Sequence, residues 1–100
     1  MKTIYLSGPM KGYPASNYPL FHRVASELRA DGHVVYNPAE FTHNEPVFPI
    51  RKAFAEYSAF ICNRADTIVL LPGYEHSLGA SAELALARNC GLAIEEWGDR

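Results

Sequence analysis

The sequence predicts an α/β fold: a single-domain, Rossmann-like (flavodoxin-like) three-layer sandwich with a four-stranded, mainly parallel sheet. Three observations lead to this prediction. Strand-like and helix-like segments alternate in the order β-α-β-α-β-α-β, and Gly or Pro follows most of them. The length of 100 residues allows one domain, residues 1–100, and leaves little room for a second. Such alternation also predicts helices on both faces of the sheet and right-handed crossovers.

The first strand and the first helix are expected near the start of the chain. Residues 2–7 are rich in β-branched and aromatic side chains and stop at Gly8-Pro9, which predicts a buried strand. A helix is expected from about Pro19 to just before Gly32, a residue type common past a helix end. Its apolar positions recur at a spacing of four: Leu20, Val24 and Leu28.

The middle of the chain predicts a strand, a loop and a second helix. Residues 33–37 form the short strand, which Pro38 ends. Residues 39–49 are polar and contain two prolines, which predicts a surface loop. The helix covers residues 50–61, where apolar side chains recur at spacings of three and four: Ile50, Ala53, Phe54, Tyr57, Phe60 and Ile61.

The last part of the chain predicts strand, helix and strand. Residues 66–71 are the clearest strand of the sequence, and Pro72 follows it. A third helix is expected over residues 79–90, which are rich in Ala and Leu, with Gly91 just past its end. Residues 92–94 predict a short final strand.

Composition narrows the class of partner. Eleven Asp and Glu against nine Lys and Arg give a formal charge of −2, which argues against nucleic acid as the main partner. No apolar run approaches the ~20 residues of a membrane helix, and the start of the chain lacks the apolar stretch of a secretory signal. We therefore expect no membrane contact and a cytoplasmic location.

Cysteine and histidine usage predicts no metal site. Cys62 and Cys90 are too few for a disulfide framework, and we expect both to pack in the core beside apolar residues. The four histidines show no ligand spacing with one another or with a cysteine: His22, His33, His43 and His76. The chain also lacks the glycine-rich motifs that bind dinucleotides or triphosphates, so no cofactor is expected.

Ligands of parallel sheets bind at the carboxyl ends of the strands. In this chain those ends lead into three loops, at residues 7–12, 37–41 and 72–79. Asp66 opens a strand at the opposite end, so a structural role is expected for it. Trp97, near the end of the chain, is interpreted as a packing residue or a dimer contact.

The start of the third helix carries the strongest functional signal. Ser77 and Gly79 offer a hydroxyl and an unobstructed backbone, and free N–H groups at a helix start attract an anion. Glu83 lies one or two turns into the helix, where we expect the helix dipole to hold its carboxylate ionised, as a nucleophile requires. The alternative is that Glu83 only complements the dipole on a surface helix.

Three further segments complete a resemblance to a known family. Gly8-Pro9-Met10 follows the first strand, Asn37-Pro38 follows the second, and residues 70–80 read Leu-Leu-Pro-Gly-Tyr-Glu-His-Ser-Leu-Gly-Ala. Together with Glu83 they resemble the nucleoside 2-deoxyribosyltransferase superfamily over nearly the full length. The chain is similar to the 2'-deoxynucleoside 5'-phosphate N-hydrolases and, still more, to the small phage and bacterial DUF4406 proteins.

The resemblance implies roles for six residues. Glu83 matches the nucleophile that attacks the anomeric carbon of deoxyribose, and Tyr5 matches a tyrosine that positions this carboxylate. The other four match substrate-binding positions, at the sugar or at the 5'-phosphate: Gly8, Lys11, Ser77 and Gly79. Serine at position 77 makes a nucleotide the better candidate than a nucleoside. The resemblance further implies a homodimer or a larger homo-oligomer, in which a second subunit completes the pocket.

The chain departs from the family pattern at the proton donor. The superfamily usually has an aspartate eight residues before the aspartate that opens the third strand, and this sequence has Ser58 there. A serine cannot act as a general acid near neutral pH. Glu56 is two positions away and is expected to point elsewhere, while Glu75 and His76 are possible substitutes from a loop.

Three functions therefore stay open from the sequence. The first is an enzyme that cleaves or transfers the N-glycosidic bond of a 2'-deoxynucleoside or its 5'-monophosphate through a covalent bond to Glu83. The second is a catalytically impaired protein that binds a nucleotide in the same pocket, which Ser58 favours. The third is a structural or interaction protein, for which only the small size speaks.

Overall fold

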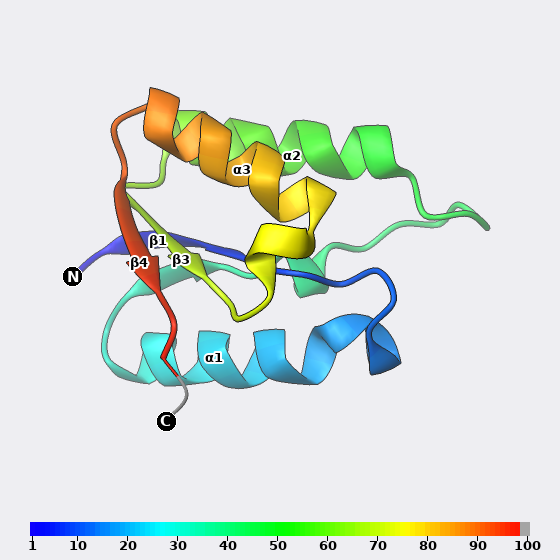
Figure 1. The fold of residues 1–100 in the computed structure, drawn as a ribbon, viewed down its shortest axis with the longest axis horizontal. Coiled ribbons are helices and arrows are strands. Elements are labelled where there is room, and N and C mark those ends of the chain that lie inside the picture. The colour runs from blue at the N-terminus through cyan, green and yellow to red at the C-terminus, as the bar shows by residue number, and fades with distance from the viewer. Residues whose placement is uncertain (99–100) are drawn as a thin grey trace.

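The computed structural model describes residues 1–98. Its strands and α-helices follow the predicted alternation (Figure 1). They are β1 (Thr3–Ser7), α1 (Tyr18–Ala30), β2 (Val34–Tyr36), α2 (Ile50–Asn63), β3 (Thr67–Leu70), α3 (Leu78–Asn89) and β4 (Ala93–Glu96). Short 3₁₀ turns lie between them at Pro14–Asn17, Pro38–Glu40 and Tyr74–His76.

The four strands form one parallel sheet in the order β2-β1-β3-β4. The chain moves from β1 outward to β2, then returns to the other side of β1 to form β3. The point at which the strand order reverses is therefore the junction of β1 and β3. In open α/β sheets this junction, at the carboxyl ends of the strands, is where ligands bind.

Helices cover both faces of the sheet, as the sequence predicts (Figure 1). Helix α1 lies on one face, and α2 and α3 lie together on the other. Alternate residues of β1 point to the two layers, since Ile4 and Leu6 pack in the α1 layer whereas Tyr5 packs in the α2/α3 layer. The confirmed architecture is a three-layer α/β sandwich.

The edge strand β4 differs from its predicted position. It covers Ala93–Glu96 rather than residues 92–94, and all four of its residues are exposed. Its register is set by backbone hydrogen bonds with β3, and Lys2 pairs with Glu95 at 2.6 Å. Hydrophobic patterning therefore missed the acidic half of the strand, because an exposed edge strand needs no apolar side chains there.

Both cysteines are exposed, so the prediction that they pack in the core is wrong. Cys62 lies in the last turn of α2, where its neighbours Phe60 and Ile61 take the core-facing positions. Cys90 follows the last residue of α3 and caps its end. Position on the helix therefore outweighs the usual preference of Cys for burial.

Asp66 and Trp97 have structural roles. The Asp66 carboxylate accepts hydrogen bonds from the Thr3 backbone N–H and the Thr67 hydroxyl, which joins the amino ends of β1 and β3. Trp97 is buried in the α1 layer, and its backbone N–H donates to the Leu70 carbonyl oxygen at 2.8 Å. Within residues 1–98, no helix has the length and apolar character needed to span a membrane.

Candidate active site

The carboxyl ends of β1 and β3 approach each other closely. The Leu71 N–H donates to the Ser7 carbonyl at 2.8 Å, which extends the β1–β3 pairing by one more bond. A Cβ atom on Gly8 would lie only 2.7 Å from the Cβ of Leu71. Glycine at position 8 is therefore required by this close approach of the two strand ends.

Glu83 faces this junction from α3. It is the sixth residue of the helix, and only 7% of its surface is exposed. The Tyr5 hydroxyl donates to Glu83 Oε2 at 2.9 Å, and the Ser7 hydroxyl donates to Glu83 Oε1 at 2.6 Å. Both oxygens of the carboxyl group thus have a fixed donor, and the orientation of the group is set by β1.

Ser7 is a member of the site that sequence reasoning missed. It lies two residues after Tyr5, and residues two apart in a strand point to the same face of the sheet. Both side chains are fully buried and bind the two oxygens of the same carboxyl group. The period-two spacing from Tyr5, at the carboxyl end of a strand, was the signal that could have identified it.

Burial raises the pKa of Glu83 to about 7, and the hydrogen bonds from Ser7 and Tyr5 oppose that rise. The helix dipole therefore does not hold the pKa of Glu83 low, contrary to expectation, and near pH 7 the carboxyl group is present in both its neutral and its ionised form. The dipole acts mainly within the first turn, whereas Glu83 lies beyond it and is surrounded by protein. Burial also raises the pKa of Tyr5 well above its usual value, so its hydroxyl remains a neutral donor.

The start of α3 is built as the sequence suggests. Ser77 is the N-cap residue, and its hydroxyl oxygen accepts a hydrogen bond from the Ala80 N–H at 3.1 Å. Gly79 is exposed, and nothing lies within 4 Å of the Cβ position it lacks. Lys11 is exposed in the loop after β1 and, among the described residues, forms no hydrogen bond or ion pair. The structure thus brings Tyr5 to Glu83, whereas Lys11 and Ser77 form no hydrogen bond with each other.

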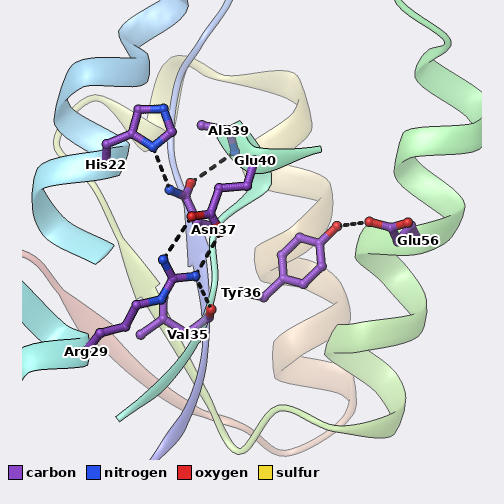
Figure 2. Close-up of polar contacts among 8 residues, drawn as sticks. All are labelled: His22, Arg29, Val35, Tyr36, Asn37, Ala39, Glu40 and Glu56. Carbon is purple, nitrogen blue, oxygen red and sulfur yellow. Dashed lines mark hydrogen bonds and ion pairs between the residues drawn. The ribbon is translucent and has the colours of Figure 1, made fainter. Parts of the chain in front are cut away.

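A second carboxyl group is linked to this site through aromatic rings. The rings of Tyr5 and Tyr36 stack with their centroids 5.5 Å apart and their planes 17° apart. The Tyr36 hydroxyl in turn donates to Glu56 on α2, and Figure 2 shows the two side chains pointing toward each other. Burial, followed by the contact with Glu56, raises the pKa of Tyr36.

Tyr36 and Glu56 also line an open pocket of about 140 Å³ at the carboxyl end of β2. Its lining comprises Val35, Tyr36, Asn37, Glu40, Phe41 and Glu56. Asn37 is buried, accepts from the Ala39 N–H at 3.0 Å and contacts the His22 ring nitrogen at 3.1 Å, which fixes the chain after β2 (Figure 2). Asn37 thus fixes the backbone on one side of the pocket, and the pocket contains two carboxyl groups, those of Glu40 and Glu56.

The two acidic groups of this pocket differ in their surroundings. Glu40 forms a bidentate ion pair with Arg29, whose two terminal nitrogens donate to the two carboxylate oxygens at 2.9 and 2.8 Å (Figure 2). Hydrogen bonding from Arg29 lowers the pKa of Glu40. Glu56 is exposed on α2 and accepts from the neutral Tyr36 hydroxyl.

Ser58 does not face Glu83. Its hydroxyl donates to the Phe54 carbonyl one turn earlier in α2, at 2.6 Å. The side chain lies on the groove between α2 and α3 together with Ala82 and Leu86, whereas Glu83 points toward the sheet. Glu75 and His76, the other candidates for a proton donor, are exposed in the turn before α3.

Comparison with known proteins assigns the family. The profile described as "Domain of unknown function (DUF4406)" matches residues 2–96, and the chain belongs to this family. Among solved structures, the chain is similar to a 2-desoxiribosyltransferase from Leishmania mexicana, with a TM-score of 0.73 and 19% sequence identity. The match covers 97% of this chain but only 64% of that chain. No curated protein matches.

The fold of this DUF4406 chain is thus the fold of a deoxyribosyltransferase. At 19% identity the likeness establishes architecture alone. What the site does is argued from its own residues.

Proposed function

We propose that this protein cleaves or transfers the N-glycosidic bond of a 2'-deoxynucleoside, in the first place a 5'-monophosphate. The observation that carries the proposal is the buried Glu83 carboxyl group, held by Tyr5 and Ser7 at the junction of β1 and β3. A structural role alone does not account for it, because burying a carboxylate without a cationic partner is costly. Buried carboxyl groups with a raised pKa are typical of catalytic sites.

The proposed reaction follows the retaining glycosidase pattern. A Glu83 oxygen forms a bond to the anomeric carbon while the bond from that carbon to the base breaks. Water then releases the sugar phosphate, or a second base takes the sugar. The Tyr5 and Ser7 hydroxyls hold the carboxylate in one orientation, which keeps the attacking oxygen aimed at the substrate.

We propose that the substrate phosphate is held locally, since the chain carries a net charge of −2. The open helix start at Ser77 and Gly79 offers backbone N–H groups to the phosphate, and we place the sugar beside Gly8 at the carboxyl end of β1. Lys11, an exposed cation in the loop after β1, is the proposed ion-pair partner of the phosphate. We further propose that the protein works as a homodimer or larger homo-oligomer.

A second candidate is a nucleotide-binding protein that has lost turnover. It is favoured by Ser58, whose hydroxyl is turned back onto its own helix and supplies no acid. The two candidates share the pocket and differ only in bond cleavage.

The test is to incubate the protein with each of the four deoxynucleoside monophosphates and to measure free base by chromatography. Glu83→Gln is compared with the unaltered protein, and the four ribonucleoside monophosphates serve as controls for the sugar. Release of base that Glu83→Gln abolishes supports the enzyme. Binding detected by calorimetry without release supports the second candidate. If neither binding nor release of base is detected, both candidate functions are contradicted.

A further inference from the structure

We propose that Glu56 is the acid that protonates the departing base, and that Tyr36 positions it. The inference rests on the proposed glycosidic reaction and deepens it. It assigns the proton donor to a residue other than Ser58, and it places the base in the pocket between Tyr36, Phe41 and Glu56.

The first argument is the physical link between this pocket and Glu83. Tyr36 is the wall that both share, because one side of its ring stacks on Tyr5 while its hydroxyl binds Glu56 inside the pocket. Tyr5 in turn donates to Glu83. Two carboxyl groups, one on α3 and one on α2, thus flank a pair of stacked rings from the neighbouring strands β1 and β2. A sugar at Glu83 would present its base toward this pocket.

The second argument is the character of the lining. Phe41 offers an aromatic face, and its ring is braced edge-on by Phe48 and by Tyr57, each 5.9 Å away. A flat aromatic ring such as a nucleobase fits a surface of this kind. The pocket also holds the carboxyl groups of Glu40 and Glu56, which can accept hydrogen bonds from an amino group of a base.

The third argument is that only one of the two pocket carboxyl groups is available for proton transfer. Glu40 is held ionised by its paired hydrogen bonds with Arg29. Glu56 accepts a hydrogen bond from the Tyr36 phenol, is exposed to solvent and, among the described residues, forms no ion pair, so its carboxyl group is accessible to a base in the pocket.

The proton and the bonds balance over one turnover. Protonated Glu56 transfers its proton to a ring nitrogen of the base while the bond from the anomeric carbon to the base breaks, and the bond to Glu83 forms. Ionised Glu56 then takes a proton from the attacking water, whose oxygen bonds to the anomeric carbon as the bond to Glu83 breaks. Glu56 ends protonated and Glu83 ends ionised, as both began.

The experiment compares Glu56→Gln with the unaltered protein on two substrates. One is a natural purine deoxynucleotide, whose base needs a proton to leave. The other is 4-nitrophenyl 2-deoxyribofuranoside 5-phosphate, whose nitrophenolate leaves without one. First-turnover rates are measured by rapid quench. Glu27→Gln, an exposed glutamate on α1, is the control, and circular dichroism confirms that each variant folds.

The expected result is selective. Glu56→Gln slows release of the purine by about 10²- to 10⁴-fold, the usual contribution of a general acid. The same variant releases nitrophenolate in a first burst at the unaltered rate, followed by slow turnover that added azide accelerates, because azide attacks without general base help. Tyr36→Phe shows the same selectivity with a smaller loss in kcat, and Glu27→Gln matches the unaltered protein.

Equal slowing of both substrates in the first turnover would assign Glu56 a structural role, and no slowing of either would exclude it from the reaction. Either result overturns the inference while leaving Glu83 as the nucleophile. If the unaltered protein releases neither leaving group, the proposed function itself fails. That outcome is distinct from the others because it appears before any variant is made.

Discussion

Replacing Glu83 by glutamine is expected to make the fold more stable at pH 8. Burial raises the pKa of this carboxyl group from 4.5 to about 7, so the native protein keeps a proton that the unfolded chain has lost. The stability that this proton uptake contributes is fully present below pH 4.5 and is lost as the pH rises through about 7. At higher pH the unaltered protein must keep a buried negative charge that the glutamine variant lacks.

The magnitude follows from the difference in pKa between the two states. The rise from 4.5 to about 7, at about 1.4 kcal/mol for each pKa unit, corresponds to about 3 kcal/mol in the free energy of unfolding. The amide oxygen of glutamine can still accept a hydrogen bond from Tyr5 or Ser7. We therefore expect Glu83→Gln to exceed the unaltered protein by about 2–3 kcal/mol at pH 8, with the gap narrowing toward pH 5.

The assay is urea denaturation of both proteins at pH 5, 6, 7 and 8. Comparing the two proteins at each pH isolates Glu83, because groups with a lowered pKa, such as Glu40 and Asp66, titrate in both. Glu27→Gln on the exposed side of α1 is the control and should show no such dependence. A glutamine variant less stable than the unaltered protein at pH 8, or a gap that does not change with pH, would refute the reasoning.

Three other predictions follow from the site and the fold. Ser7→Ala removes a hydrogen bond that lowers the pKa of Glu83, so the acidic side of the pH–activity profile should shift to higher pH by about one unit. An acidic side at the same pH in the variant and the unaltered protein would contradict this role of Ser7. Gly8→Ala should destabilise the fold by about 1–3 kcal/mol in urea denaturation, because its Cβ would meet Leu71 at 2.7 Å. Gly79→Ala, with open space around its Cβ position, should be neutral or slightly stabilising, and equal losses for both glycines would be inconsistent with this geometry. Both cysteines should react with a thiol reagent in the native protein, and protection of either until unfolding would show that it is buried.

The architecture could be predicted from the sequence because its signals are local. Helix periodicity and the Gly and Pro residues between elements placed each helix and strand to within a few residues, whereas the strand order was not predicted. The edge strand β4 was misplaced because its exposed residues carry no hydrophobic pattern. Local signals also failed for Cys62 and Cys90, whose exposure depends on which face of a helix meets its neighbour.

The candidate site was only partly predictable. The pairing of Tyr5 with Glu83 across 78 residues came from resemblance and is present in the structure at 2.9 Å. The raised pKa of Glu83 could not be predicted, because it arises from burial by segments far apart in sequence. Glu56 was correctly expected to point away from the position of Ser58, but its partner Tyr36 lies on another strand and could be found only in three dimensions.

The most direct test of the central claim is to trap the covalent intermediate. The protein is incubated with a 2'-fluoro-arabinose analogue of a deoxynucleoside monophosphate, whose fluorine slows loss of the sugar from the enzyme. It is then digested and analysed by mass spectrometry. If Glu83 is the nucleophile, the peptide containing it gains the mass of the fluorinated sugar phosphate, and Glu83→Gln gains none. Release of base with no adduct, or an adduct on another residue, would contradict the assignment.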